Sequence, residues 1–152
     1  MITDNRNLSP ERTEADPAAP ERIRRIALTV LHALGSPDAE LSVLICEDPE
    51  IAEYNEVYLK RKGATNVIAF PMQEGEFSDI SPYLLGDVVI SADTALREAE
   101  DMGISFEERL DELLIHGILH LFGYDHEKSE EEELRMERKS GELLALIRQK
   151  HF

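Results

Sequence analysis

The segment His116-Gly-Ile-Leu-His120-Leu-Phe-Gly123-Tyr-Asp-His126 holds three of the five histidines in this chain of 152 residues. His116 and His120 are four positions apart, so a helix would place both imidazoles on one face. Gly123 can adopt the left-handed conformation that ends a helix, and His126 follows closely enough to join the pair. Three imidazoles with one open position are typical of a catalytic zinc site. We therefore expect His116, His120 and His126 to bind one zinc ion that activates water for hydrolysis.

The spacing H-x-x-x-H-x-x-G-x-x-H also occurs in the metzincin metalloproteases, where a glutamate directly after the first histidine acts as general base. In this chain that position is Gly117, so the ligands agree with a peptidase but the base is absent. Ordinary core or surface histidines would explain one pair at this spacing, yet a third histidine after a helix-ending glycine argues against coincidence. A non-catalytic zinc clip usually has four ligands and prefers cysteine. The one cysteine, Cys46, lies in a distant apolar run and is expected in the core.

Charge and composition restrict the class of protein. The chain has 32 acidic and 16 basic residues, which give a net charge of −16 and a pI near 4.6. This charge disfavours a protein covered in positive potential for nucleic acid, although it is compatible with a local basic cleft. The basic clusters around residues 22–25 and 60–62 are each expected to be solvated surface. One cysteine excludes an intrachain disulfide, and we expect a cytoplasmic protein.

Signals for strands and helices alternate along the first part of the chain, and helices dominate the last part. Ser105 with Glu108, and Ser129 with Glu132, have the spacing of capping boxes that open helices. Hydrophobic periodicity, prolines and glycines set the other boundaries. The expected elements are helices at 20–34, from 48 onward, at 93–102, 106–122 and up to about 148, strands at 41–46, 67–70 and 87–91, and a loop at 72–85.

This order of elements predicts an α+β fold, in which a small sheet packs against helices. Residues 1–19 are polar and contain prolines, so we expect a flexible leader followed by a single domain over 20–152. No apolar run approaches the length that spans a bilayer, and the N-terminus lacks the pattern of a signal peptide. We expect a monomer that does not bind membranes.

Three segments of the chain resemble the bacterial YbeY endoribonucleases. The histidine segment matches the family signature closely, residues 85–91 match the strand before the histidine helix, and residues 55–58 with 65–71 match an upstream segment. The resemblance implies a small mixed sheet packed by helices, distantly similar to the zincins, with His116, His120 and His126 as ligands of a metal usually taken as zinc. It also implies an endoribonuclease for small-subunit ribosomal RNA maturation and ribosome quality control, so single-stranded RNA is the expected partner.

The chain departs from the family pattern in the upstream segment. The family usually has an arginine directly after the aromatic residue, where this chain has Leu59, and its Asp-x-Pro-Thr stretch is Lys62-Gly-Ala-Thr65 here. A cation near the metal would bind phosphate and stabilise its developing charge. Lys60 and Arg61 are therefore the candidate catalytic cations, and the alternative is that they belong to a solvated turn. Without such a cation, the chain would be a weaker nuclease or would use the site differently.

No residue is an obvious general base. Glu112, one turn before His116, and Asp125, beside His126, are candidates for orienting the imidazoles, or are ordinary solvated acids. Two other functions stay open. One is a metallohydrolase of another substrate, such as a peptidase, and the other is a ribosome-assembly binding factor whose metal is structural. Cleavage of RNA by the purified protein, with and without metal, separates these functions.

Overall fold

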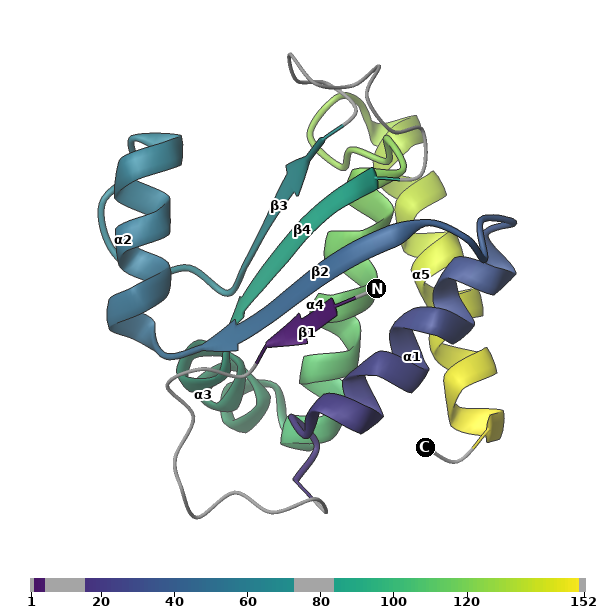
Figure 1. The fold of residues 1–152 in the computed structure, drawn as a ribbon, viewed down its shortest axis with the longest axis horizontal. Helices are drawn as coiled ribbons and strands as arrows, with labels where there is room; N and C mark the ends of the chain where they lie inside the picture. The colour runs from purple at the N-terminus through teal and green to yellow at the C-terminus, as the bar shows by residue number, and fades with distance from the viewer. Residues whose placement is uncertain (1, 5–15, 73–83, 151–152) are drawn as a thin grey trace.

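The computed structural model describes residues 2–4, 16–72 and 84–150, which form one four-stranded mixed sheet and five helices (Figure 1). The predicted α+β fold, a small mixed sheet packed by helices, is confirmed. In chain order the elements are β1 (Ile2–Asp4), α1 (Pro20–Ala33), β2 (Glu40–Cys46), α2 (Asp48–Leu59), β3 (Val67–Pro71), β4 (Leu84–Ser91), α3 (Ala92–Met102), α4 (Phe106–Leu121) and α5 (Glu130–Lys150).

The strands lie in the order β1-β2-β4-β3. β2 runs parallel to both β1 and β4, with Ile45 opposite Ile90 in the central pair. β3 is antiparallel to β4 and occupies the edge, with Ile68 opposite Val89. The helix that carries the first two histidines, α4, packs across β3 and β4. The first two predicted metal ligands, His116 and His120, are therefore placed near the antiparallel edge of the sheet.

The two faces of the sheet are covered unequally. α1, α4 and α5 bury apolar side chains against one face, in a core that includes Val43, Ile90 and Ile118. On the other face, α2 contributes Ile51 to a smaller cluster that contains Cys46, which is buried as predicted. Figure 1 shows α2 standing apart from the other helices. The histidine helix is thus fixed within the main core, whereas α2 has much of its surface open to solvent.

Local signals explain where several helices begin and end. At the start of α4, Ser105 Oγ accepts a hydrogen bond from the N–H of Glu108 at 3.0 Å. At the start of α5, Ser129 Oγ accepts one from the N–H of Glu132 at 3.1 Å. Both predicted caps therefore form, and they satisfy backbone donors that the first helical turn leaves unpaired. Gly103, with φ of 72°, ends α3 in the left-handed conformation.

β4 begins at Leu84 rather than at residue 87, where the sequence analysis placed its start. Gly86 explains the difference. A Cβ atom at this position would lie 2.3 Å from the carbonyl oxygen of Phe70 on β3. A glycine in a strand pattern suggests a break, but here it permits the close approach of the neighbouring strand. The rest of the predicted loop, residues 73–83, lies outside the described residues.

The predicted leader over residues 1–19 contains a strand for which the sequence has no clear signal. Ile2–Asp4 forms β1 and pairs with β2, and three residues are too few to give a periodic signal. Ala18 and Ala19 are buried directly before α1, and residues 5–15 lie outside the described part of the chain. The flexibility of the leader and the domain boundary at residue 20 therefore stay predictions. No helix among the described residues is long and apolar enough to cross a membrane.

Candidate metal centre

Helix α4 packs unusually closely on the sheet at Gly117, directly after the first histidine. A Cβ atom on Gly117 would lie 2.6 Å from Cγ1 of Val88 and 3.2 Å from Cγ2 of Val67. A larger residue would therefore force the helix and the sheet apart. This position, which carries the general base in metzincins, faces the sheet here and has no room for a carboxylate side chain. A peptidase mechanism of that type is thus excluded by packing as well as by sequence.

The three predicted metal ligands lie together. The ring centroids of His116, His120 and His126 are separated by 4.8, 5.2 and 5.6 Å. One nitrogen from each imidazole can be chosen so that all three lie within 4.8 Å of one another. Nitrogens bound to one tetrahedral zinc ion lie about 3.4 Å apart, so the three rings enclose a space that an ion can occupy.

The turn after α4 brings the third histidine to the other two. Gly123 has φ of 93°, and its N–H donates to the carbonyl oxygen of His120 at 3.0 Å, so its predicted role in ending the helix is confirmed. The next ring, Tyr124, lies beneath the guanidinium of Arg135 on α5, which is 4.3 Å from the ring centroid. This cation–π contact links the turn to α5 and helps to position His126.

The two helical imidazoles are in the protonation state that metal binding requires. Burial, followed by the nearby His120, His126 and Arg109, lowers the pKa of His116 to about 4. Burial and His126 also lower the pKa of His120, against an opposing effect of nearby acidic residues. Both rings are therefore neutral at pH 7, and neutral imidazole donates its lone pair to a metal. The donor set thus fits zinc, which His116, His120 and His126 could hold together.

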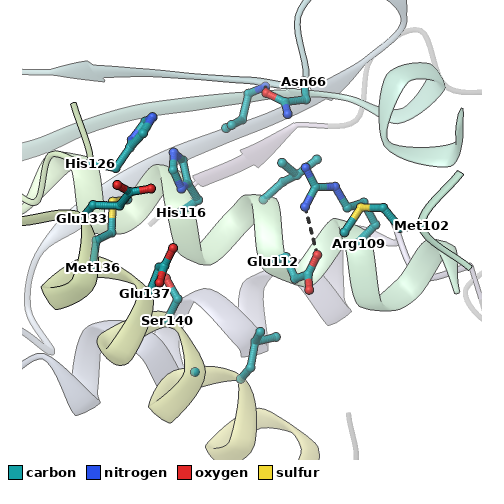
Figure 2. Close-up of a pocket in the computed structure, with 14 residues that line it drawn as sticks. Asn66, Met102, Arg109, Glu112, His116, His126, Glu133, Met136, Glu137 and Ser140 are labelled. Atoms are coloured by element: carbon teal, nitrogen blue, oxygen red, sulfur yellow. Dashed lines mark hydrogen bonds and ion pairs between the residues drawn. The ribbon is translucent and has the colours of Figure 1, made fainter. Parts of the chain in front are cut away.

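A pocket of about 590 Å³ opens beside His116 and His126 (Figure 2). One wall belongs to α5, and the opposite side is formed by α4 and the start of β3. Among the residues that line the pocket, Arg109 is the one lysine or arginine. The polar lining residues are Asn66, Arg109, Glu112, His116, His126, Glu133, Glu137 and Ser140. The pocket therefore combines two metal-ligand candidates with an acidic wall and a single permanent cation.

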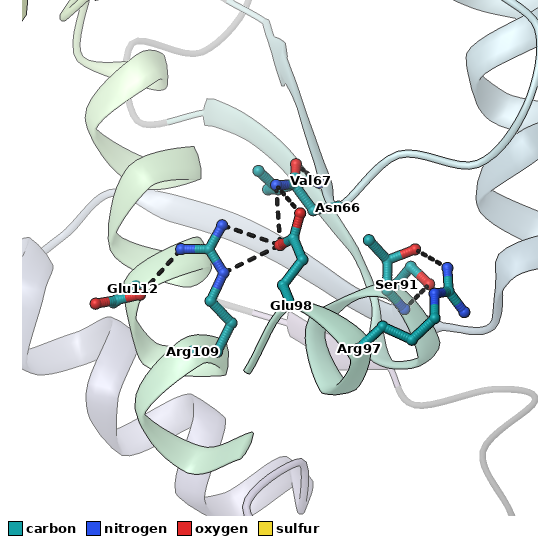
Figure 3. A network of polar contacts seen from close by, with 8 residues as sticks. Asn66, Val67, Ser91, Arg97, Glu98, Arg109 and Glu112 are labelled. Carbon is teal, nitrogen blue, oxygen red and sulfur yellow. Dashed lines mark hydrogen bonds and ion pairs between the residues drawn. The ribbon is translucent and has the colours of Figure 1, made fainter. Parts of the chain in front are cut away.

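Arg109 is held by two carboxylates (Figure 3). Its Nε and Nη2 donate to Oε1 of Glu98 at 3.0 and 2.9 Å, and its Nη1 donates to Glu112 at 2.9 Å. The amide of Asn66 donates to both oxygens of Glu98 at 3.2 Å. This network ties α3, α4 and the start of β3 together. It leaves the Arg109 side chain 18% exposed at the pocket wall.

Lys60 and Arg61, the predicted catalytic cations, follow the end of α2. Both are exposed, and neither lines the pocket beside the histidines. Lys60 is in the left-handed conformation with φ of 57°, and its Nζ donates to the carbonyl oxygen of Val57 at 3.0 Å. The structure thus does not bring these cations to the pocket wall, and their contact with phosphate stays a prediction.

The two carboxylates predicted to orient the imidazoles have other partners. Glu112 lines the pocket but accepts its hydrogen bond from Arg109. Asp125 accepts from the backbone N–H of Glu127 at 2.9 Å. Within the described residues, neither carboxylate is hydrogen-bonded to a histidine.

Three charged residues of the pocket wall, Arg109, Glu133 and Glu137, were not predicted from the sequence. Arg109 lies seven positions before His116, so helical periodicity alone could have placed it on the same face. Glu133 and Glu137 carried no such signal, because their approach to the site depends on how α5 packs against α4.

Comparison with known proteins shows the family of this chain. The model of the endoribonuclease YbeY family matches residues 9–148. The chain belongs to the YbeY family. The endoribonuclease YbeY of Geobacter sulfurreducens is 53% identical over 137 residues, which cover 90% of this chain and 91% of that protein. The endoribonuclease YbeY of Aquifex aeolicus is 50% identical over 113 residues, which cover 74% of this chain and 73% of that protein.

The fold is shared with a solved structure. The solution structure of TM1509 from Thermotoga maritima superposes with a TM-score of 0.67, over 99% of this chain and 91% of that one, at 23% sequence identity. The resemblance noted from the sequence is therefore confirmed at the level of the family, and the arrangement of sheet and helices is one that occurs in a solved protein.

Proposed function

We propose that this YbeY family member is a metal-dependent endoribonuclease that hydrolyses phosphodiester bonds in single-stranded RNA. The observation that carries the proposal is the convergence of three histidines, two of them neutral by burial, beside an open pocket. The relatives named endoribonuclease YbeY support the reaction class. We further propose small-subunit ribosomal RNA as the substrate, one zinc ion per chain as the cofactor, and a monomer that acts in the cytoplasm.

His116, His120 and His126 would hold the zinc ion. When bound, zinc would supply a Lewis acid for the phosphate and lower the pKa of water toward about 7. Arg109, in the wall of the same pocket, can donate a charge-assisted hydrogen bond to a phosphate oxygen in exchange for its contact with Glu112. Such a contact would stabilise charge that develops on the phosphate during cleavage.

Lys60 and Arg61 are the second source of positive charge for the substrate. Both residues lie outside the pocket wall. They are therefore better placed to contact phosphates that flank the cleaved bond than to contact the cleaved phosphate itself. We therefore propose that Arg109 serves the pocket itself, and that the two residues after α2 serve the approaching strand. Arg109→Lys would keep the positive charge but lose the planar guanidinium fork that donates to two partners at once, so it should lower the rate of RNA cleavage.

Cleavage of a single-stranded RNA by the full chain, loaded with one equivalent of zinc, tests the proposed function. His120→Ala should abolish cleavage, because two imidazoles hold zinc far less well than three. His32→Ala is the matched control, since His32 is an exposed histidine on α1 outside the site, and it should cleave like the unmodified chain.

Two results would contradict the proposal. If His120→Ala cleaved RNA at the rate of the unmodified chain, the histidine site would not be required for the reaction. A zinc-loaded, folded chain that cleaves no RNA would instead support a ribosome-assembly binding factor whose metal is structural.

A further inference from the structure

The end of α2 exposes three consecutive apolar side chains. Val57, Tyr58 and Leu59 have exposed fractions of 50%, 63% and 40%. Consecutive side chains on a helix point in different directions, so the three do not form one patch, and Tyr58, the largest and most exposed of them, is the candidate contact. The group lies on α2, the helix that stands apart from the others in Figure 1.

Two other aromatic rings pack against the Tyr58 ring. It meets Phe70 of β3 edge to face, with centroids 5.6 Å apart, and lies nearly parallel to Tyr54 at 6.1 Å. These contacts fix the orientation of the ring, yet most of its surface stays open to solvent. A rigid aromatic ring with an open face is suited to stacking against a planar group, since little conformational entropy is lost on binding.

Positive charge follows directly after this ring. Lys60, Arg61 and Lys62 are all exposed, and none of the three has an ion-pair partner among the described residues. No aspartate or glutamate occurs between Glu56 and Glu74, although acidic residues outnumber basic ones by 32 to 16 in the whole chain. The chain directly after Tyr58 is therefore locally basic within a strongly acidic sequence.

The backbone that carries these cations is held in place by Asn55. This buried side chain donates from Nδ2 to the carbonyl oxygen of Gly63 at 3.0 Å. The backbone carbonyl oxygen of Asn55 accepts from the backbone N–H of Arg61 at 3.2 Å. Lys60 makes the sharp turn between them in the left-handed conformation. The basic residues are thus presented by a structured turn rather than by a loose loop.

We propose that Tyr58 and the residues Lys60, Arg61 and Lys62, named here the Tyr58 surface, bind single-stranded RNA outside the histidine pocket. A base stacks on Tyr58 while the adjacent phosphates contact the cations. Stacking on an aromatic ring beside a basic groove is the usual way in which proteins bind single-stranded nucleic acid. An acidic protein partner would complement the charge but gains less from an open aromatic face. The proposal rests on the proposed function, and it assigns the strand a path away from the acidic α5 wall.

Binding of a fluorescein-labelled single-stranded RNA of twelve nucleotides, followed by anisotropy with zinc chelated, tests the Tyr58 surface without any cleavage. Tyr58→Ala should weaken binding about tenfold, since one base–aromatic stack contributes about 1–3 kcal/mol. Tyr58→Phe should bind like the unmodified chain, because it keeps the ring. Arg61→Ala/Lys62→Ala avoids the strained Lys60 position and should lower the slope of log affinity against log salt by about 1.4.

The matched control is Arg24→Ala/Arg25→Ala, which removes the same charge from exposed positions on α1. If this control weakens RNA binding as much as the Arg61/Lys62 pair, or if Tyr58→Ala binds like the unmodified chain, the Tyr58 surface is not an RNA site. In the cleavage reaction, the proposal predicts a raised KM with kcat retained for Tyr58→Ala. Failure of the zinc-loaded chain to cleave RNA would refute the proposed function instead, and would leave the binding result to stand separately.

Discussion

Replacement of Gly117 by alanine tests how closely the histidine helix must pack on the sheet. The added Cβ would lie 2.6 Å from Cγ1 of Val88, whereas carbon atoms in favourable contact are about 3.5–4.0 Å apart. Valine is stiff about χ1, so the helix and the strand must separate locally by about 1 Å. Overpacking of this kind costs about 1–3 kcal/mol, and replacing a helical glycine by alanine recovers about 1 kcal/mol. We therefore expect Gly117→Ala to lower the free energy of unfolding by about 1 kcal/mol.

Gly141→Ala is the matched control, because it is a glycine-to-alanine change in a helix where the added Cβ meets no atom within 4 Å. It should raise the free energy of unfolding by about 0.5–1 kcal/mol, through the lower entropy of the unfolded chain. Urea denaturation of both variants, in the absence of zinc, measures the difference. Equal stabilisation by the two substitutions would refute the argument that α4 depends on a glycine at this contact.

Three other predictions follow from the site and its surroundings. Asp48 accepts from the hydroxyls of Ser91 and Thr94, both at 2.6 Å, and from Arg97. Burial by itself raises the pKa of the Asp48 carboxyl. The hydrogen bonds lower it by more, so the pKa lies below its ordinary value of 3.8. Asp48→Asn should therefore cost about 2 kcal/mol in urea denaturation at pH 7, with the difference shrinking as pH falls below 3.8 through the folded-state pKa. Chelation of zinc should lower the melting temperature by about 5–10 °C, since zinc at 100 times its Kd adds about 2.7 kcal/mol, and equal melting temperatures after confirmed metal removal would contradict this. Leu59→Arg, which restores the family arginine, should keep or raise the rate of RNA cleavage. Lys60→Ala/Arg61→Ala should lower that rate, and an unchanged rate would show that neither cation takes part in cleavage.

The helices and the histidine site could be predicted because their signals are local. Ser105 and Ser129 cap helices through residues only three positions away, and Gly123 ends α4 through its own backbone conformation. The convergence of the histidines follows from the helical repeat and from this one turn. Such interactions depend little on the rest of the chain, so sequence spacing is sufficient to identify them.

The pocket wall and the sheet order depend on packing between distant segments. Arg109 on α4 donates to Glu98 on α3, which also accepts from Asn66 directly before β3. Gly86 belongs to β4 because a glycine there lets Phe70 of β3 approach closely. β1 is too short to be recognised without its partner β2. Periodicity describes one element at a time, so it could place Arg109 on the histidine face of α4 but could not indicate that Glu133 and Glu137 of α5 would face the histidines.

The metal content of the purified chain tests the central claim most directly. Elemental analysis should find about one transition metal ion per chain, with zinc predominant, in the unmodified protein and in the His32→Ala control. The His120→Ala variant, folded as judged by circular dichroism, should lose that metal, because only His116 and His126 are left to bind it. Full metal occupancy in folded His120→Ala would contradict the account, since the ion would then be bound by residues other than this group of three histidines.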